Sequence, residues 1–179
     1  MSTKKFNFKG FIKGAEIARQ ENERQKALKS YKSLYYGLTS ILFPIWEENW
    51  KQYPENSFRQ GRFYLAPGRR NKDGSYTYPE IDWDAYNEFR SQCWMEFLEN
   101  DLGLAKPIEL LPMKDIKTSR ENLINFCREN SVELGLPEGE TSIAPSEGQV
   151  VEYLIQVNLD NLKAKGVYTT QEPKEEVAF

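Results

Sequence analysis

The stretch "AEIARQENERQKALKSYKSLYYGLTSILFPIWEENWKQY", residues 15–53, decides the fold of this chain. Between Leu28 and Trp50, apolar residues recur every three or four positions, which is the period of one face of an α-helix. Pro44 interrupts this pattern, because proline lacks an amide proton and disfavours helix in the residue before it. The sequence therefore predicts either a helix that ends near Leu42 and a second over 44–53, or one kinked helix.

The first half of this stretch, residues 16–33, is almost entirely polar. Its few apolar residues include Ile17 and Leu28. We expect this half to project from the body of the protein, or to pack through a narrow stripe that includes these two side chains.

A second amphipathic helix is predicted in "WDAYNEFRSQCWMEFLENDLG", residues 83–103. Asp82 precedes it as an N-cap, and Gly103 follows its last apolar residue as a stop signal. Its aromatic and aliphatic residues fall along one face, so this helix is expected in the core.

Two shorter helices are predicted in the last third of the chain. Thr118 and Glu121 match a capping box and indicate the start of the first of them. Ser146 and the residues after it start the second, which ends at Gly166. Both carry apolar residues at helical spacing, as a helix that packs on a core does.

One β-element is predicted between the helical stretch 15–53 and the helix over 83–103. The aromatic runs "GRFYLAP", 61–67, and "SYTYPEI", 75–81, flank "GRRNKDG", 68–74, whose glycines and aspartate favour turns. The fold class is therefore mostly α (α+β), with about five helices packed as one compact domain and one β-hairpin near residues 62–80. We expect a basic aromatic N-terminal arm over 1–14, the domain over 15–167, and an acidic tail over 168–179.

Composition excludes several kinds of chemistry. The chain of 179 residues contains no histidine, which removes Ser/His/Asp and Cys/His nucleophiles and nearly all transition-metal sites. Cys93 and Cys127 each lie in an apolar helical pattern, which favours buried, reduced thiols. No apolar run has the length of a membrane span. We therefore expect a soluble cytoplasmic protein with no membrane association, no metal and no cofactor.

The net charge of -3 hides a gradient along the chain. Residues 1–32 hold nine Lys and Arg against three Glu, whereas residues 133–179 hold three against nine acids. This polarity favours a basic end that meets a negatively charged partner.

The predicted hairpin concentrates cations and aromatic rings. This segment contains five basic residues and one acidic residue, Asp73, which gives it a local charge of +4. Aromatic rings and guanidinium groups hold nucleic acid strands and also anchor protein interfaces, and a solvated turn is the third interpretation. Alternation along the strand sends Phe63 and Leu65 to one face and Tyr64 to the other, so half the rings should face the core. The candidate binding residues are Arg59, Arg62, Tyr64, Arg69, Arg70, Lys72, Tyr76 and Tyr78.

The N-terminal arm "KKFNFKGFIKG", residues 4–14, places apolar rings among lysines. It suits an anionic membrane surface, a groove on a partner, or a strand that packs on the chain's own core, and docking on self or partner is favoured. Its candidate interaction residues are Lys4, Lys5, Phe6, Phe8, Lys9 and Phe11.

These observations favour a non-catalytic interaction or accessory protein that docks into a larger macromolecular assembly. The contacts would be the basic N-terminal helix and the hairpin, and the charge allows the assembly to contain nucleic acid. The alternative is a direct single-stranded nucleic acid binding protein. A carboxylate-based, metal-dependent enzyme comes third and would need Asp82, Asp84, Glu109 and Lys114 in one cleft.

Overall fold

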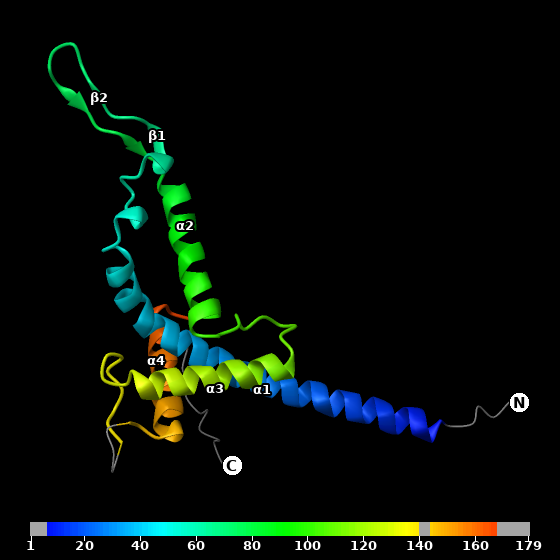
Figure 1. Cartoon of the computed structure of the whole chain (residues 1–179). Coiled ribbons are helices and arrows are strands. Elements are labelled where there is room, and N and C mark those ends of the chain that lie inside the picture. Colours follow the sequence, from blue (N-terminus) through cyan, green and yellow to red (C-terminus); the bar gives the residue numbers. More distant parts are fainter. Residues whose placement is uncertain (1–6, 140–143, 168–179) are drawn as a thin grey trace, which may run out of the picture. The chain divides into compact units, whose positions relative to one another are not determined.

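The computed structural model describes residues 7–139 and 144–167 and is mostly helical, with a short antiparallel β-structure (Figure 1). The predicted mostly α (α+β) class, with about five helices and a hairpin near residues 62–80, is therefore confirmed. The α-helices are α1 (Phe8–Trp50), α2 (Trp83–Glu96), α3 (Met113–Glu129) and α4 (Glu147–Ala164), and a π-helical turn, Phe97–Asp101, follows α2. Two 3-10 turns, Pro54–Asn56 and Gly61–Phe63, precede the strands β1 (Tyr64–Ala66), β2 (Arg69–Arg70), β3 (Tyr76–Thr77) and β4 (Glu80–Ile81).

The chain divides into two compact units. Unit 1 combines residues up to Leu38 with those from Ala105 onward, and unit 2 comprises Thr39–Leu104. Each unit has its own buried residues. The domain boundaries predicted at residues 14 and 167 stay a prediction.

α1 is one continuous helix that includes Pro44. Of the two predicted alternatives, the single helix is therefore correct. It also starts earlier than the predicted Ala15, because the side-chain oxygen of Asn7 accepts a hydrogen bond from the amide of Gly10 (3.0 Å). Asparagine is among the preferred N-caps, so the start of the helix has a local cause.

The core of unit 1 forms where α1, α3 and α4 bury apolar side chains. Leu28 is only 1% exposed, whereas Ile17 is 58% exposed. The predicted stripe is therefore right at Leu28 and wrong at Ile17. The reason is where contact between α1 and the rest of unit 1 begins. The Arg24 guanidinium donates to the carbonyls of Glu109 (2.7 Å) and Leu111 (3.0 Å). Ile17 lies almost two helical turns before Arg24 and is exposed.

Tyr31 places a polar group inside this core. The ring is fully buried, and its hydroxyl donates to the carbonyl of Ala105 (2.7 Å). The amide of Ala105 in turn donates to the buried hydroxyl of Ser119 (3.0 Å). Burial raises the pKa of the Tyr31 phenol, so the neutral form that donates this hydrogen bond is maintained.

The helix predicted from Thr118 begins earlier, at Met113. The capping box at Thr118 and Glu121 is therefore wrong, because Thr118 lies inside α3 and its hydroxyl donates to the carbonyl of Lys114 (3.0 Å). Pro112 precedes the helix in an extended conformation, and the buried Ile116 extends the apolar face of α3 toward it. The carbonyl of Pro112 accepts from the amides of Asp115 (3.0 Å) and Ile116 (3.0 Å), and proline has no amide proton that would need a partner at this N-cap position.

The predicted start of α4 is confirmed. The Ser146 hydroxyl accepts from the amide of Gln149 (3.3 Å), and the Gln149 side chain accepts from the amide of Ser146 (2.8 Å). This reciprocal pair is a complete capping box. Gly166 follows the helix with a φ of 69°, a conformation that suits glycine.

Unit 2 is held together by aromatic rings. Trp50, Phe63 and Tyr86 are buried, with Trp46 and Phe89 among the rings packed on them. The predicted boundaries of the helix after the hairpin are confirmed. Asp82 accepts a hydrogen bond from the amide of Ala85 (3.0 Å), and Gly103 has a φ of 65°.

Within the described residues, we find no helix with the combined length and apolarity that a membrane crossing requires.

α1 and α4 approach each other closely at Gly37. A Cβ atom on this residue would lie 2.9 Å from the carbonyl carbon of Leu154 and 3.2 Å from its Cα, so backbone would have to move. We expect Gly37→Ala to lower the free energy of unfolding by about 1–3 kcal/mol, as overpacking does. Urea unfolding followed by helical circular dichroism measures this change.

Gly14→Ala is the matched control, because Gly14 lies in the same helix and a Cβ atom added there would have nothing within 4 Å. It should leave stability unchanged or raise it by up to about 1 kcal/mol through helix propensity. Equal effects of the two substitutions would contradict the close contact between α1 and α4.

Cys127 is fully buried in unit 1, and burial raises the pKa of its thiol to about 12. The thiolate is the reactive form, so we expect alkylation of Cys127 in the folded protein to be at least about 100-fold slower than in denaturant. A Cys93→Ser variant isolates this thiol for the measurement. Equally fast alkylation with and without denaturant would contradict the burial of Cys127.

Candidate interaction site

The hairpin of unit 2 is built from two paired ladders. β1 pairs antiparallel with β4, and β2 pairs antiparallel with β3, with an irregular register at Ala66. Figure 1 shows this ribbon continuing beyond the N-terminal end of α2. Its tip is therefore held away from the aromatic cluster of the same unit.

The turn at the tip is fixed by its own polar groups. The amide of Gly74 donates to the carbonyl of Asn71 (3.1 Å), and the amide of Asn71 donates to that of Ser75 (2.8 Å). Gly74 has a φ of 86°, which favours glycine. The carboxylate of Asp73 accepts from the hydroxyl (2.6 Å) and amide (2.9 Å) of Ser75, and these bonds lower its pKa. The one acid of the turn is therefore used within the turn.

The two faces of the hairpin differ in chemistry. Arg70 lies opposite Tyr76, and Arg69 lies opposite Thr77. Directly opposed residues in an antiparallel pair share a face, and neighbours along a strand point to opposite faces. On the Arg69 face, the side-chain amide of Asn71 donates to the hydroxyls of Ser75 (2.8 Å) and Thr77 (3.0 Å).

The Arg70 face carries the two exposed tyrosines. The rings of Tyr76 and Tyr78 meet edge to face, with centroids 5.4 Å apart and an angle of 83°. Tyr76 is 54% exposed and Tyr78 81% exposed. Gly68 lies beneath the Tyr76 ring, because a Cβ there would come within 2.9 Å of the ring carbon that bears the hydroxyl. We name Arg70, Tyr76 and Tyr78 the aromatic face of the hairpin.

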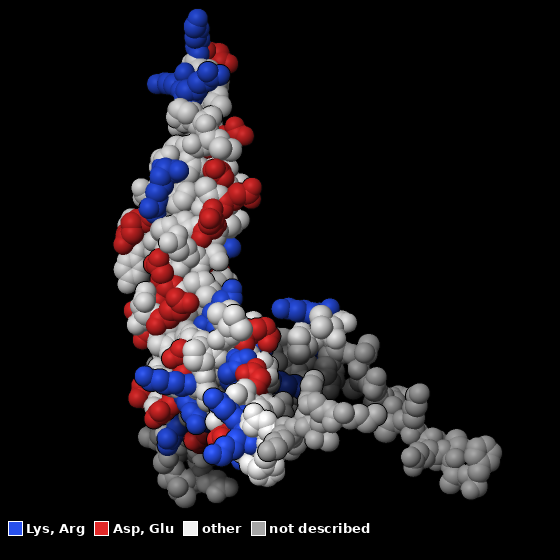
Figure 2. Space-filling view, turned by 90° about the vertical axis from the view of Figure 1, so that its right-hand side faces the viewer, with Lys and Arg blue, Asp and Glu red and all other residues white. Residues whose placement is uncertain are grey.

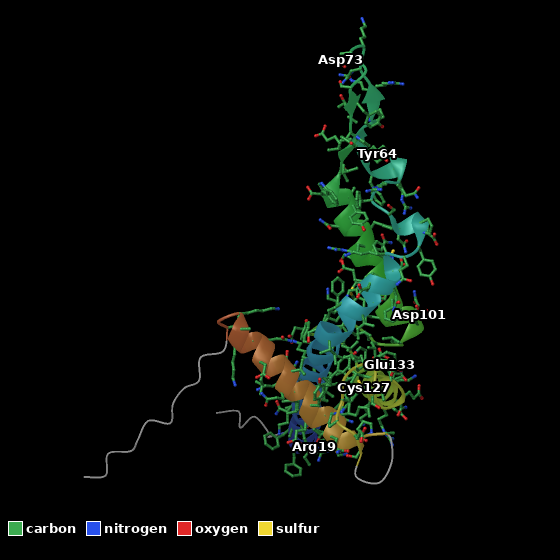
Figure 3. All side chains as sticks on the ribbon, turned by 90° about the vertical axis from the view of Figure 1, so that its left-hand side faces the viewer. Arg19, Tyr64, Asp73, Asp101, Cys127 and Glu133 are labelled. Carbon is green, nitrogen blue, oxygen red and sulfur yellow. The ribbon has the colours of Figure 1, made fainter. Side chains whose placement is uncertain are left out.

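The cations of the tip have no partner in the described chain. Arg69, Arg70 and Lys72 are exposed, and none makes a side-chain hydrogen bond or ion pair with another described residue. Figure 2 shows basic side chains gathered at this tip and acidic ones along the body of the unit beneath it. Figure 3 places Asp73 at the apex and Tyr64 nearer the base. The tip is thus a short positive region on a unit with seven basic and eleven acidic residues.

Arg62 belongs to the anchor of the hairpin. Its guanidinium lies 4.7 Å from the ring centroid of Phe63 and 4.2 Å from that of Phe89. It also donates to the carbonyl of Glu55 (2.7 Å). All three contacts, two cation–π interactions and one hydrogen bond, lie within unit 2, so this side chain supports the local fold.

Arg59 and Tyr64 also make contacts at the base. The Tyr64 hydroxyl donates to the carbonyl of Arg59 (2.6 Å), and the Arg59 guanidinium lies 5.6 Å from the ring centroid of Phe58. Of the residues expected to face the core, Phe63 is 4% exposed, but Leu65 is 62% exposed. The expectation for Leu65 is wrong, because the chain has already passed the buried cluster at this point.

The structure describes three of the six predicted N-terminal interaction residues. Lys4, Lys5 and Phe6 lie outside the described residues. Phe8, Lys9 and Phe11 form the start of α1, so the arm is helical here and not a strand. Phe8 is 63% exposed and Phe11 61% exposed, so neither ring is buried in a core.

The carboxylates considered for catalysis have structural roles. Asp82 caps α2, and Glu109 forms an ion pair with Lys32 (2.6 Å) that lowers the Glu109 pKa. Asp84 lies in the first turn of α2, and Lys114 lies in α3. Over residues 7–139 and 144–167, no group of three or more histidine, cysteine or acidic residues has an arrangement that would hold a metal ion.

Sequence reasoning missed the residues that shape the aromatic face. The sequence indicates only a turn at Gly68, but this residue lies beneath the Tyr76 ring. Asn71 ties the strands together through its side chain. A glycine near an aromatic residue on the opposing strand was the available signal, since aromatic rings often cover glycine in sheets.

No protein-family model, no curated protein and no solved structure matches this chain. Its function therefore has to be inferred from the residues of the site themselves.

Arg62 and Arg70 should differ in their effect on stability. We expect Arg62→Ala to lower the free energy of unfolding of unit 2 by about 1–2 kcal/mol, because two ring contacts and a hydrogen bond are lost. Arg70→Ala should stay within about 0.5 kcal/mol of the unchanged protein. All four tryptophans lie in unit 2, so tryptophan fluorescence during urea unfolding reports on this unit. Equal effects of the two substitutions would show that Arg62 does not anchor the hairpin.

Proposed function

We propose that this chain is a non-catalytic interaction protein that docks into a larger macromolecular assembly through the hairpin. The proposal is supported mainly by the exposed side chains at the tip of the hairpin. The tip exposes Tyr76 and Tyr78 beside Arg69, Arg70 and Lys72, and the turn beneath them is stabilised by other residues.

The residue types at the tip are those that supply binding energy at protein interfaces. Tyrosine and arginine are enriched among the few residues whose truncation weakens binding most. A tyrosine that stabilises the fold is usually buried with its hydroxyl paired, as Tyr31 is. Tyr78, at 81% exposed, is the opposite case. A role in contact with another molecule accounts for this exposure.

The hairpin is also well ordered for binding. Gly74 and Asp73 fix the turn, and Asn71 links the two strands. Affinity is reduced by the conformational entropy that binding removes, so a surface that is already ordered loses less. The basic start of α1, with Phe8, Lys9 and Phe11, is proposed as the second contact.

Direct binding of single-stranded nucleic acid is the second candidate function. An exposed ring such as Tyr78, beside a guanidinium, is a surface on which a base stacks. The two candidates differ in their response to salt, because phosphate contacts weaken steeply as salt concentration rises.

Substitution of Arg69, Arg70 and Lys72 by Ala tests the proposal. The unchanged chain should capture a defined protein from a lysate of its native host, with and without nuclease. The variant should retain at most about a tenth of this protein, because it lacks the cations of the tip. The captured protein is quantified by mass spectrometry.

Substitution of Lys114, Lys163 and Lys165 by Ala is the control. These three exposed lysines lie on α3 and at the end of α4, and their removal changes the net charge equally. This variant should capture as much as the unchanged chain. Undiminished capture by the hairpin variant would contradict the proposal, and capture that nuclease abolishes would favour the nucleic acid alternative.

A further inference from the structure

The chemistry of the partner can be inferred from the difference between the two faces of the hairpin and from the confinement of the tip's cations to residues 69–72. We infer that the aromatic face is the docking face and that its occupant is a short acidic segment of a partner protein, with an apolar side chain next to its carboxylates. This inference rests on the proposed function and names the partner's chemistry.

On the other face, the uncharged polar side chains are paired with one another, and the Arg69 guanidinium is not. The side chains of Asn71, Ser75 and Thr77 form one hydrogen-bonded group there. On the aromatic face, by contrast, the hydroxyls of Tyr76 and Tyr78 make no hydrogen bond to another described residue. Each face therefore carries an unpaired guanidinium, Arg70 on the aromatic face and Arg69 on the other, but only the aromatic face places exposed rings beside it.

The charge around the tip limits the size of a negatively charged occupant. Three cations lie within residues 69–72, and the next ionised side chains along the chain after the turn are Glu80, Asp82 and Asp84. Glu80 lies on the hairpin itself, opposite Ala66. A nucleic acid strand carries a phosphate at every nucleotide, so one that extended from the tip along the hairpin would approach these carboxylates. A segment with two or three negative charges is accommodated at the tip alone.

The ring geometry also favours a peptide. Single strands bind to aromatic platforms by stacking successive bases on successive rings. Tyr76 and Tyr78 are inclined at 83°, so they do not offer two parallel planes. Two rings that meet edge to face form an angular apolar surface, which suits an aliphatic or proline side chain. The Arg70 guanidinium, which shares this face, supplies a fork of donors for a neighbouring carboxylate.

A comparison of two adjacent charge reversals tests the inference. The full chain is used to select from a random peptide library, and one selected peptide is synthesised with a fluorescent label. Arg70→Glu and Arg69→Glu change the net charge equally at neighbouring positions on opposite faces, so the general electrostatic effect is similar. Fluorescence anisotropy then measures the affinity of each variant for the labelled peptide.

We expect the selected peptides to be enriched in Asp and Glu next to Pro, Leu, Ile or Val. Arg70→Glu should weaken binding at least about tenfold, and Arg69→Glu no more than about threefold. Tyr78→Ala should weaken binding at least about tenfold, because the ring surface is lost. Tryptophan fluorescence during urea unfolding confirms that each variant keeps unit 2 folded.

Three results would overturn the inference. These are a selection without acidic enrichment, equal losses for Arg69→Glu and Arg70→Glu, and an oligothymidylate that binds more tightly than the best peptide. In each of them the proposed docking function stands if lysate capture still depends on Arg69, Arg70 and Lys72. If lysate capture does not depend on these three residues, the proposed function itself is wrong, and this result is distinct from the three above.

Discussion

The exposed surface of the hairpin depends on the burial of Phe63 at its base. A two-stranded ribbon is marginally stable in water because it has no core of its own. Phe63 is 4% exposed, and its ring meets that of Tyr86 edge to face at 5.3 Å. Its carbonyl accepts from the amide of Asp82 (2.7 Å), which also caps α2. The base of the hairpin is thus tied to the start of the helix that follows it.

This anchor allows side chains of one type to serve different purposes. Arg62 lies over the rings of Phe63 and Phe89, whereas the Arg70 side chain makes no hydrogen bond or ion pair with another described residue. Near the anchor, an arginine stabilises the fold, and at the tip it is available to another molecule. The proposed function follows from this separation, since a binding surface that does not support the fold can be optimised for its partner.

The features that the sequence predicted correctly are mostly local. The caps at Asp82 and Ser146 and the stop at Gly103 follow from hydrogen bonds between residues close in the chain. The prediction at Thr118 was wrong because a short capping pattern also occurs by chance inside a longer helix. Pro112, together with the buried face that Ile116 extends, sets the true start of α3.

The features that could not be predicted depend on distant neighbours. Arg62 and Arg70 are indistinguishable in the sequence, and Phe89, which fixes Arg62, is remote in the chain. The exposure of Leu65 depends on where the buried cluster ends, and Ile17 on where the rest of unit 1 meets α1. Periodicity gives the face of a helix or strand, but it does not give the extent of the core that covers this face.

A photo-crosslinking side chain at the tip tests the central claim most directly. A benzophenone amino acid replaces Tyr78 in one variant and Tyr53, another exposed tyrosine of unit 2, in the other. After irradiation in a lysate of the native host, we expect position 78 to form a covalent adduct with one defined protein, and position 53 to form none. No adduct from position 78, or the same adducts from both positions, would contradict docking through the hairpin.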